Sequence, residues 1–275
     1  MPERSVDYDE IATQYDSRYQ ADHYPQLEEE VAAFVRDRRV LEVGCGTGYW
    51  LAVAQAAGAD VAGVDASEHM LSLARRRLPN AELMTGRAES LSWDDSTFDR
   101  VICINALHHF DDPSRFIGEA ARVLRPSGQM TVGLDPYCGL DAWWIYDCFE
   151  GTVARDRARY PSAERIMGWF TDAGLNDART YQAEHLHWDL TVEEARSAGY
   201  LEKATTSQLV LLREQEYYAR IQSILESERA ADGNGEVLSL RTDLRLWATT
   251  GRRGDTLGVG VAGSPLPEVG ALERS

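Results

Sequence analysis

Long apolar runs are missing from this sequence, and no export signal is visible in its first residues. No run approaches the length of about 18 apolar residues needed to span a bilayer. The opening stretch, MPERSVDYDEIATQYDSRY, is acidic and aromatic, whereas a signal peptide begins with basic residues followed by apolar ones. We therefore expect a soluble, cytoplasmic protein that does not use a membrane as a partner.

Paired cysteines are also missing. The four cysteines, Cys45, Cys103, Cys138 and Cys148, form no C-x-x-C pair. In a chain without an export signal such cysteines are expected to be reduced, and no structural metal site is indicated. Cys45 and Cys103 fall in apolar surroundings, which favours a role as small hydrophobic residues.

Basic residues are scarce compared with acidic ones. Lys and Arg number 28 against 45 Asp and Glu, so the formal net charge is −17. This balance disfavours long contact with a phosphate backbone, and the short basic runs at 36–39 and 74–78 fit the solvated ends of helices. Nucleic acid is therefore not an expected partner.

Apolar segments of strand length alternate with helical segments through the first half of the chain. The expected strands are residues 40–43, 61–65, 81–86, 100–104, 129–135, 177–188 and 243–250. This alternation predicts an α/β fold, a doubly wound and mostly parallel sheet of seven strands with helices on both faces. A helical cap is expected as an insertion late in the sheet.

The expected organisation has five parts. They are N-terminal helices at 1–38 divided at Pro25, a Rossmann-like core at 39–138, an aromatic helical cap at 139–176, the last two strands at 177–250 with an inserted lobe at about 190–232, and a loose tail at 251–275. The aromatic cap and the lobe should roof a ligand pocket, because their aromatic residues exceed what the sheet can cover.

The stretch VLEVGCGTGYW at 40–50 places Gly44, Gly46 and Gly48 directly after a strand. Ligands of open parallel sheets bind beyond the carboxyl ends of the strands, and glycine lets the backbone approach them closely. Asp65 ends the next strand about 20 residues later, where a carboxylate accepts hydrogen bonds from both ribose hydroxyls. A nucleoside ligand is predicted; the alternative is that Asp65 caps the following helix, although Ser67 could fill that position.

The dinucleotide fingerprint G-x-G-x-x-G would need glycine where the chain has Tyr49. The pattern is instead E-x-G-x-G-x-G, from Glu42 to Gly48, and it resembles the class I S-adenosylmethionine-dependent methyltransferases, in particular the broad small-molecule, type 11-like group. The resemblance implies S-adenosylmethionine as cofactor and S-adenosylhomocysteine as product. It also implies that Glu42 organises the loop and reaches the cofactor ammonium.

Further motifs carry the same resemblance in order: VAGVDAS, TGRAESLSW, NALHHF and an N-terminal Y-x-x-x-A-x-x-Y-D pattern. The cofactor contacts that it implies are Tyr15, Tyr19, Glu42, Gly44, Gly46, Gly48, Asp65, Ala66, Met70, Gly86, Arg87, Ala88, Glu89, Asn105 and Ala106. Arg87 departs from the family pattern, which commonly has an aspartate at this position. An aspartate can accept a hydrogen bond from the adenine amino group, whereas a guanidinium cannot. Tyr15 and Tyr19 could instead be aromatic packing residues of an amphipathic helix.

A general base is useful when the methyl acceptor is a hydroxyl, an amine or an acidic carbon. We expect His109, and after it His108, to act as that base, with the alternative that one of them packs inward against the sheet. His185 and His187 share a strand face but lack a third ligand, so no metal site is predicted. Asp111 and Asp112 are expected to start a helix at position 113.

The sequence thus predicts an enzyme that transfers a methyl group by in-line displacement to a small-molecule acceptor. Three alternatives remain open: an RNA-modifying methyltransferase, a non-catalytic nucleoside-binding or regulatory protein on the same fold, and a nicotinamide-dependent oxidoreductase. No motif indicates the acceptor atom or the oligomeric state.

Overall fold

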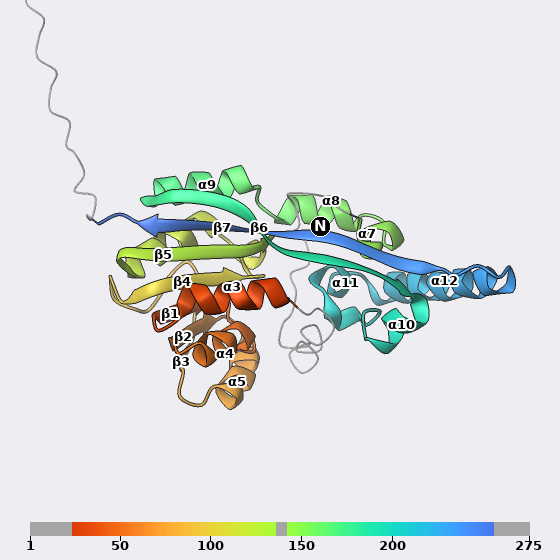
Figure 1. Ribbon diagram of the computed structural model, residues 1–275, viewed down its shortest axis with the longest axis horizontal. Helices are drawn as coiled ribbons and strands as arrows, with labels where there is room; N and C mark the ends of the chain where they lie inside the picture. Colours follow the sequence, from red (N-terminus) through yellow and green to blue (C-terminus); the bar gives the residue numbers. More distant parts are fainter. Residues whose placement is uncertain (1–23, 136–141, 256–275) are drawn as a thin grey trace, which may run out of the picture.

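The computed structural model describes residues 24–135 and 142–255, whose strands form one seven-stranded sheet in the order β3-β2-β1-β4-β5-β7-β6 (Figure 1). The strands are β1 (Arg39–Val43), β2 (Asp60–Asp65), β3 (Glu82–Thr85), β4 (Phe98–Ile104), β5 (Leu124–Asp135), β6 (Leu175–Thr191) and β7 (Ser239–Arg253). The first five strands pair in parallel, and β7 runs antiparallel to β5 and β6. The predicted fold class, a mostly parallel, doubly wound sheet, is confirmed.

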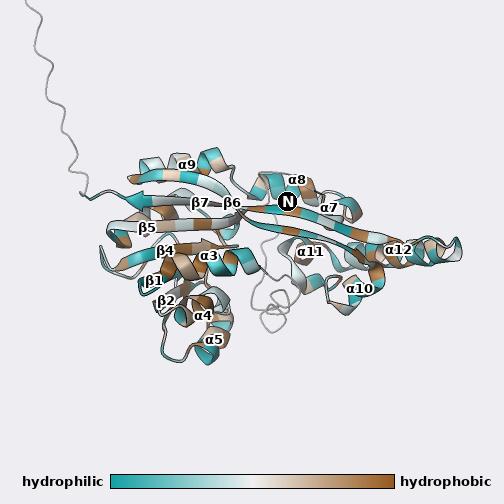
Figure 2. Cartoon of the chain, viewed as in Figure 1, coloured by the Kyte–Doolittle hydropathy of each residue, from teal (hydrophilic) through white to brown (hydrophobic). Residues whose placement is uncertain are grey.

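Helices cover both faces of this sheet. They are α3 (Pro25–Val35), α4 (Tyr49–Ala56), α5 (Glu68–Arg77), α6 (Pro113–Val123) and α9 (Ala163–Asp172), with a 3₁₀ turn η1 (Leu107–His109) after β4. Buried side chains of α6 and α9 pack on one face, and those of α3, α4 and α5 pack on the other. Figure 2 colours the chain by hydropathy and shows hydrophobic stretches, in brown, on β4 and α4.

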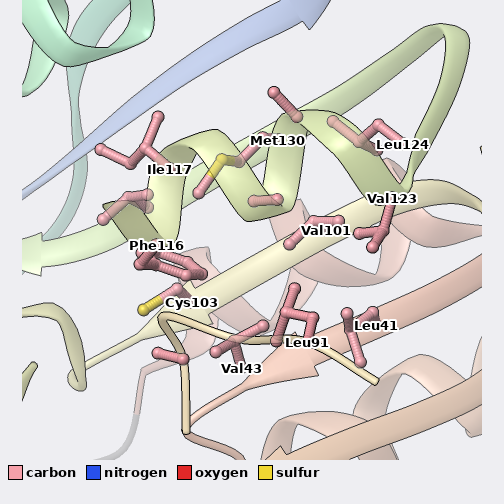
Figure 3. Packing of buried hydrophobic residues seen from close by; sticks show 14 of the residues in the cluster. Leu41, Val43, Leu91, Val101, Cys103, Phe116, Ile117, Val123, Leu124 and Met130 are labelled. Carbon is pink, nitrogen blue, oxygen red and sulfur yellow. The ribbon is translucent and has the colours of Figure 1, made fainter. Parts of the chain in front are cut away.

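The strands supply both cores because successive side chains point to opposite faces. Along β4, Val101 and Cys103 belong to the core under α6, whereas Ile102 and Ile104 belong to the core under α3 and α4. Figure 3 shows the first core, where side chains of α6 meet those of β1, β4 and β5. Such continuous apolar strands are typical of parallel sheets buried on both faces.

The last two strands are much longer than the others and carry a second, helical body (Figure 1). This lobe consists of α7 (Trp144–Cys148), α8 (Thr152–Arg159), α10 (Val192–Ser197), η3 (Lys203–Thr205), α11 (Ser207–Val210) and α12 (Glu214–Gly233). It has its own apolar cluster, which includes Trp144, Phe149 and Leu209. The expected helical insertion therefore lies between β6 and β7, at the far end of a two-stranded ribbon.

Most expected strand boundaries differ from the structure by a few residues, and two of the differences bear on the organisation of the chain. β5 begins at Leu124 instead of residue 129, and β7 continues to Arg253, so residues 251–253 do not belong to a loose tail. The reason is a hydrogen bond that no periodicity reveals: the buried Arg253 guanidinium donates to the carbonyl oxygen of Arg122 at 2.9 Å and thereby holds the strand end at the start of β5. None of the helices in the described ranges has the length and hydropathy to cross a membrane.

A carboxylate of β6 caps the helix that leads into the core. Glu184 is 1% exposed, and its Oε2 accepts hydrogen bonds from the backbone N–H groups of Gln26 at 3.0 Å and Leu27 at 3.2 Å. These are donors of the first turn of α3, which lack partners inside the helix. Because Tyr24 at the N-cap position makes no side-chain cap bond, Glu184 acts as the cap from another element.

Replacing Glu184 by Ala should lower the free energy of unfolding by about 1–3 kcal/mol, because two buried N–H groups lose their acceptor. Chemical denaturation monitored by circular dichroism would measure this. Asp189→Ala, a change at an exposed carboxylate of the same strand, should stay within about 0.5 kcal/mol of the wild type. Equal stability of the two variants would contradict the capping role.

Candidate functional site

The glycine loop lies at the carboxyl edge of the parallel strands and packs against the segment that follows β4. Gly44 has a φ of +76°, and a Cβ built on it would lie 2.4 Å from the Cβ of Ala106. Gly48 has a φ of +77° and occupies the N-cap position of α4. Two of these glycines are therefore required by the fold itself, because side chains would be strained at both positions and would collide with Ala106 at the first.

Asp65 joins the loop to the next helix. One carboxylate oxygen accepts the backbone N–H of Gly46 at 2.8 Å, and the other accepts that of Ser67 at 2.9 Å. The hydroxyl of Ser67 caps α5 by accepting the N–H of Met70 at 3.0 Å. The side-chain cap of α5 is thus Ser67, and Asp65 instead holds the loop.

Glu42, at the base of the loop, has an unusual, deeply buried carboxyl group. The residue is 1% exposed, and its Oε2 has no hydrogen-bond partner among the described residues. Burial, and next the negative charge of Asp65, raise the pKa of the Glu42 carboxyl well above its usual value, while a hydrogen bond from the Leu51 backbone lowers it. An unpartnered buried carboxylate is costly, and a bound cation would offset that cost.

The predicted adenine-edge segment is tied to the same edge of the sheet. The N–H of Gly86 donates to the Asp65 carbonyl oxygen at 3.0 Å. Glu89 is buried, and its Oε1 accepts the backbone N–H groups of Asp111 at 2.9 Å and Asp112 at 3.2 Å. Glu89 therefore positions the turn between η1 and α6, a role that the sequence alone did not indicate.

Arg87, the departure from the family pattern, is an exposed residue that forms ion pairs with Asp111 and Glu89. Asp112 starts α6 as expected, because its side chain accepts the N–H of Arg115 at 3.0 Å. Asp111 pairs with Arg87 instead, so only one of the two aspartates caps the helix. Asp112 is the N-cap residue itself, whereas Asp111 precedes it and pairs with a side chain from another segment.

The remaining predicted contacts differ in their accessibility. Ala66 is exposed, Ala88 is buried, and Met70 is only 1% exposed. Met70 therefore presents almost no surface to a ligand in this conformation. Tyr15 and Tyr19 lie outside the described residues. The cofactor contacts assigned to all of these positions stay predictions.

The two histidines of η1 face a large pocket. Their rings lie 3.9 Å apart, and the His108 ring also packs against Tyr160 at 4.2 Å between centroids. The Tyr160 hydroxyl lies 3.3 Å from His108 Nε2. Both histidines line the pocket, and His108 also borders a second hollow against β5 and β7, so the roles of base and of packing residue both stay predictions.

A buried polar chain fixes Tyr160 from the lobe side. The carboxylate of Asp156 accepts the amide N–H of Gln208 at 2.7 Å and the hydroxyl of Tyr146 at 2.8 Å. The same amide nitrogen of Gln208 lies 3.5 Å from the Tyr160 hydroxyl. The lobe thereby orients a side chain that contacts His108.

The pocket has about 760 Å³ of empty space and opens to solvent. It is lined by Tyr24, Asn105, His108, His109, Trp143, Trp144, Ile145, Tyr160, Leu186, Trp188, Tyr200, Thr205, Thr206, Ser207, Gln208, Thr242, Leu244 and Leu246. Its walls come from the core edge, from α7 and α11, and from the β6–β7 ribbon. The aromatic segment and the lobe do roof a pocket, although no motif indicated Thr242 or Gln208 as lining residues.

His185 and His187 do not join this pocket. Nε2 of His185 bonds to Oδ1 of Asp243 at 2.8 Å, and the two histidine rings lie 5.8 Å apart. In the described ranges no group of three potential metal ligands is present. Cys45, Cys103 and Cys148 are free thiols, and burial raises the pKa of the Cys45 and Cys103 thiols well above the usual value, which makes them poor nucleophiles.

The fold and the site together define a class. A parallel sheet that ends in an antiparallel β7, with a glycine loop after β1 and an acidic residue ending β2, is the architecture of the class I methyltransferases. Comparisons with known proteins agree with this. The family model described as "Methyltransferase domain" matches residues 41–132.

Two relatives illustrate the extent of the similarity. An uncharacterized methyltransferase of Mycobacterium tuberculosis is 42% identical over 93 residues, which is 34% of this chain and 38% of that relative's length. A demethylmenaquinone methyltransferase of Renibacterium salmoninarum is 31% identical over 195 residues, which is 62% of this chain and 82% of that relative. The chain belongs to the S-adenosylmethionine-dependent methyltransferase family.

Solved structures share the fold at low identity. The YcgJ protein from Bacillus subtilis matches with a TM-score of 0.53 and 20% identity, over 84% of this chain and 99% of that one. The phosphoethanolamine N-methyltransferase 2 of Haemonchus contortus, solved in complex with S-adenosyl-L-methionine, matches with a TM-score of 0.57 and 17% identity, over 90% of this chain and 57% of that one.

The raised pKa of Glu42 predicts a pH effect on the protein without cofactor. The folded state holds the Glu42 proton more tightly than the unfolded state, so stability falls as the pH rises above the ordinary carboxyl value of 4.5. Glu42→Gln removes this titration and should flatten the decline of the melting temperature toward neutral pH. Thermal melts across this range would measure it. The control is Glu226→Gln, at an exposed position, which should keep the wild-type slope of melting temperature against pH. The prediction is contradicted if Glu42→Gln also keeps the wild-type slope.

Proposed function

We propose that this protein transfers the methyl group of S-adenosylmethionine to a small-molecule acceptor. The observation that carries the proposal is the unpartnered carboxylate oxygen of Glu42, buried at the base of the glycine loop and close enough to Asp65 for their charges to interact. Two carboxylates favour a cationic ligand over an anionic one. The methionyl part of this cofactor carries an ammonium and a sulfonium.

The carboxyl of Glu42 also disfavours the nicotinamide alternative. A dinucleotide would bring a pyrophosphate to the loop, next to the buried carboxyl of Glu42 on β1, whereas Asp65 at the end of β2 suits the ribose of either cofactor. Dinucleotide sites instead place the phosphates against glycine N–H groups and a helix N-terminus. Here the N–H of Gly46 already donates to Asp65.

Particular residues would hold the cofactor. Glu42 would face the ammonium, the carboxylate of Asp65 at the end of β2 would accept the ribose hydroxyls, and the segment 86–89 would border the adenine. The bound cofactor supplies an electrophilic methyl group. The protein's part is to place an acceptor in line with the methyl–sulfur bond, a contribution of roughly 7–11 kcal/mol when alignment is good.

His109 is the proposed general base, with His108 beside it. Both rings line the pocket directly after β4, at the edge that carries the glycine loop. Tyr160 lies against His108 through its ring and hydroxyl, so the two histidines and this tyrosine form one cluster at the pocket wall. A base in this position would accept the proton of a hydroxyl or amine acceptor.

Support for a small molecule comes from the pocket between the core and the lobe and from relatives such as the demethylmenaquinone methyltransferases. The net charge of −17 argues against the RNA-modifying alternative. We propose the cytoplasm as the place of action.

The cofactor is testable by calorimetry. S-Adenosylmethionine and S-adenosylhomocysteine should bind, whereas NADH and NADPH should give no measurable heat at the same concentrations. Binding of a nicotinamide cofactor alone would refute the proposal.

Asp65→Ala should weaken S-adenosylhomocysteine binding at least tenfold, because hydrogen bonds to a charged acceptor contribute about 1.5–3 kcal/mol. The loop would also lose its bond from the Gly46 N–H. Asp60→Ala, at the exposed start of the same strand, is the matched control and should bind normally. Unchanged affinity in Asp65→Ala would remove the ribose assignment.

His109→Ala should reduce methyl transfer to a hydroxyl acceptor by about 10²- to 10⁴-fold while leaving S-adenosylhomocysteine affinity nearly unchanged. A library of small phenols, amines and carboxylic acids incubated with methyl-labelled S-adenosylmethionine would supply the acceptor for this measurement. Wild-type rates in the variant would exclude His109 as the base.

A further inference from the structure

The pocket extends far beyond the core, along the ribbon of β6 and β7. Leu186 pairs with Leu244 and Trp188 pairs with Thr242, and all four of these residues line it. On β7 the lining residues Thr242, Leu244 and Leu246 alternate, as expected for one strand face. At about 3.3 Å per residue they cover roughly 13 Å of the ribbon. The pocket is therefore elongated, with the histidines at its core end.

An unsatisfied hydroxyl lies at the far end of this pocket. Thr242 is 1% exposed, and its Oγ1 has no hydrogen-bond partner among the described residues. Buried polar atoms are nearly always hydrogen-bonded, so an exception inside a pocket indicates a place for a ligand oxygen or nitrogen.

Tryptophans flank that hydroxyl on both sides. Trp188 on β6 is the strand partner of Thr242, and Trp143 forms an antiparallel bridge to Thr242 from the other side. Tyr200 stacks on Trp188 at 4.8 Å with an interplanar angle of 29°, which holds the indole in place. Aromatic side chains at this spacing present rigid faces for a flat ring.

A second unsatisfied polar atom lies at the core end. The amide nitrogen Nδ2 of Asn105 is buried, lines the pocket and has no partner among the described residues. Asn105 directly follows β4 and adopts a φ of +56°, in the left-handed region. An amide N–H here can donate to an oxygen of the reacting group.

We propose that the acceptor is an uncharged, elongated aromatic compound with an oxygen at each end, a class that rests on the proposed function. One end carries the hydroxyl to be methylated, beside Asn105 and His109, and the other carries a hydroxyl or carbonyl that bonds to Thr242. In the transfer, a new bond forms between acceptor oxygen and methyl carbon as the methyl–sulfur bond breaks. The hydroxyl proton passes to His109, and the bonding electrons remain on the sulfur of S-adenosylhomocysteine.

Three stilbenes probe this arrangement by calorimetry in the presence of S-adenosylhomocysteine. trans-4,4′-Dihydroxystilbene is flat and has an oxygen at both ends, trans-4-hydroxystilbene lacks the second one, and 4′-hydroxystilbene-4-carboxylate replaces it by a charge. The diol should bind at least threefold more tightly than the other two, because a neutral hydrogen bond accounts for that much and a charge beside Thr242 would lose water between Trp143 and Trp188.

The decisive variant is Thr242→Val, which removes the hydroxyl at nearly constant volume. It should weaken diol binding about three- to tenfold and leave 4-hydroxystilbene binding within twofold. Thr249→Val is the matched control, because Thr249 lies on the opposite face of the same strand and its hydroxyl bonds to Thr180. The control should bind all three probes as the wild type does.

Separate readouts distinguish the two proposals. Absence of S-adenosylhomocysteine binding would overturn the proposed function. Two other outcomes would overturn only the acceptor class, provided that S-adenosylhomocysteine binds normally. One is that Thr242→Val weakens the binding of the diol and of 4-hydroxystilbene equally, and the other is that the carboxylate probe binds most tightly. Unchanged S-adenosylhomocysteine affinity and melting temperature in Thr242→Val show that a loss of diol affinity does not come from misfolding.

Discussion

The hydrogen bonds accepted by Asp65 are the interaction on which the site depends. This one carboxylate binds the N–H groups of Gly46 and Ser67, and so fixes the glycine loop relative to the start of α5. Its charge also contributes to the raised pKa of Glu42 at the base of the loop. The protein thus holds two acidic side chains whose charges interact at the base of the loop. A positively charged ligand bound there would favour the ionised form of both carboxyl groups.

The second constraint is the β6–β7 ribbon, which joins the helical lobe to the core. Glu184 of β6 caps α3 at one end of the ribbon, and the lobe clusters around the other end. The polar chain from Asp156 through Gln208 to Tyr160 then reaches His108. The lobe therefore orients Tyr160, which contacts His108. The same hydrogen-bonded chain thus links the wall of the pocket to the candidate base.

Local patterns predicted which residues gather at the carboxyl edge of the sheet. The glycine loop, Asp65 and the histidine pair occupy the same sheet edge, since the carboxyl ends of parallel strands converge there. The same reasoning missed Glu89, which holds the backbone of the turn after η1, and it assigned to a tail the end of β7 that Arg253 fixes. Both errors concern a side chain bonded to backbone far away in the sequence, and no periodicity carries that information.

The sequence by itself determined the class of fold and the chemistry of the loop. Alternation of apolar strands and helices specifies a doubly wound sheet, and the motif from Glu42 to Gly48 specifies the type of cofactor. Only the tertiary structure decided the acceptor pocket. Thr242, Tyr160 and Asn105 come from three distant segments and line one pocket, because the ribbon of β6 and β7 holds the lobe beside the core. Their partners are set by packing between elements, whereas the loop is set by residues that are neighbours along the chain.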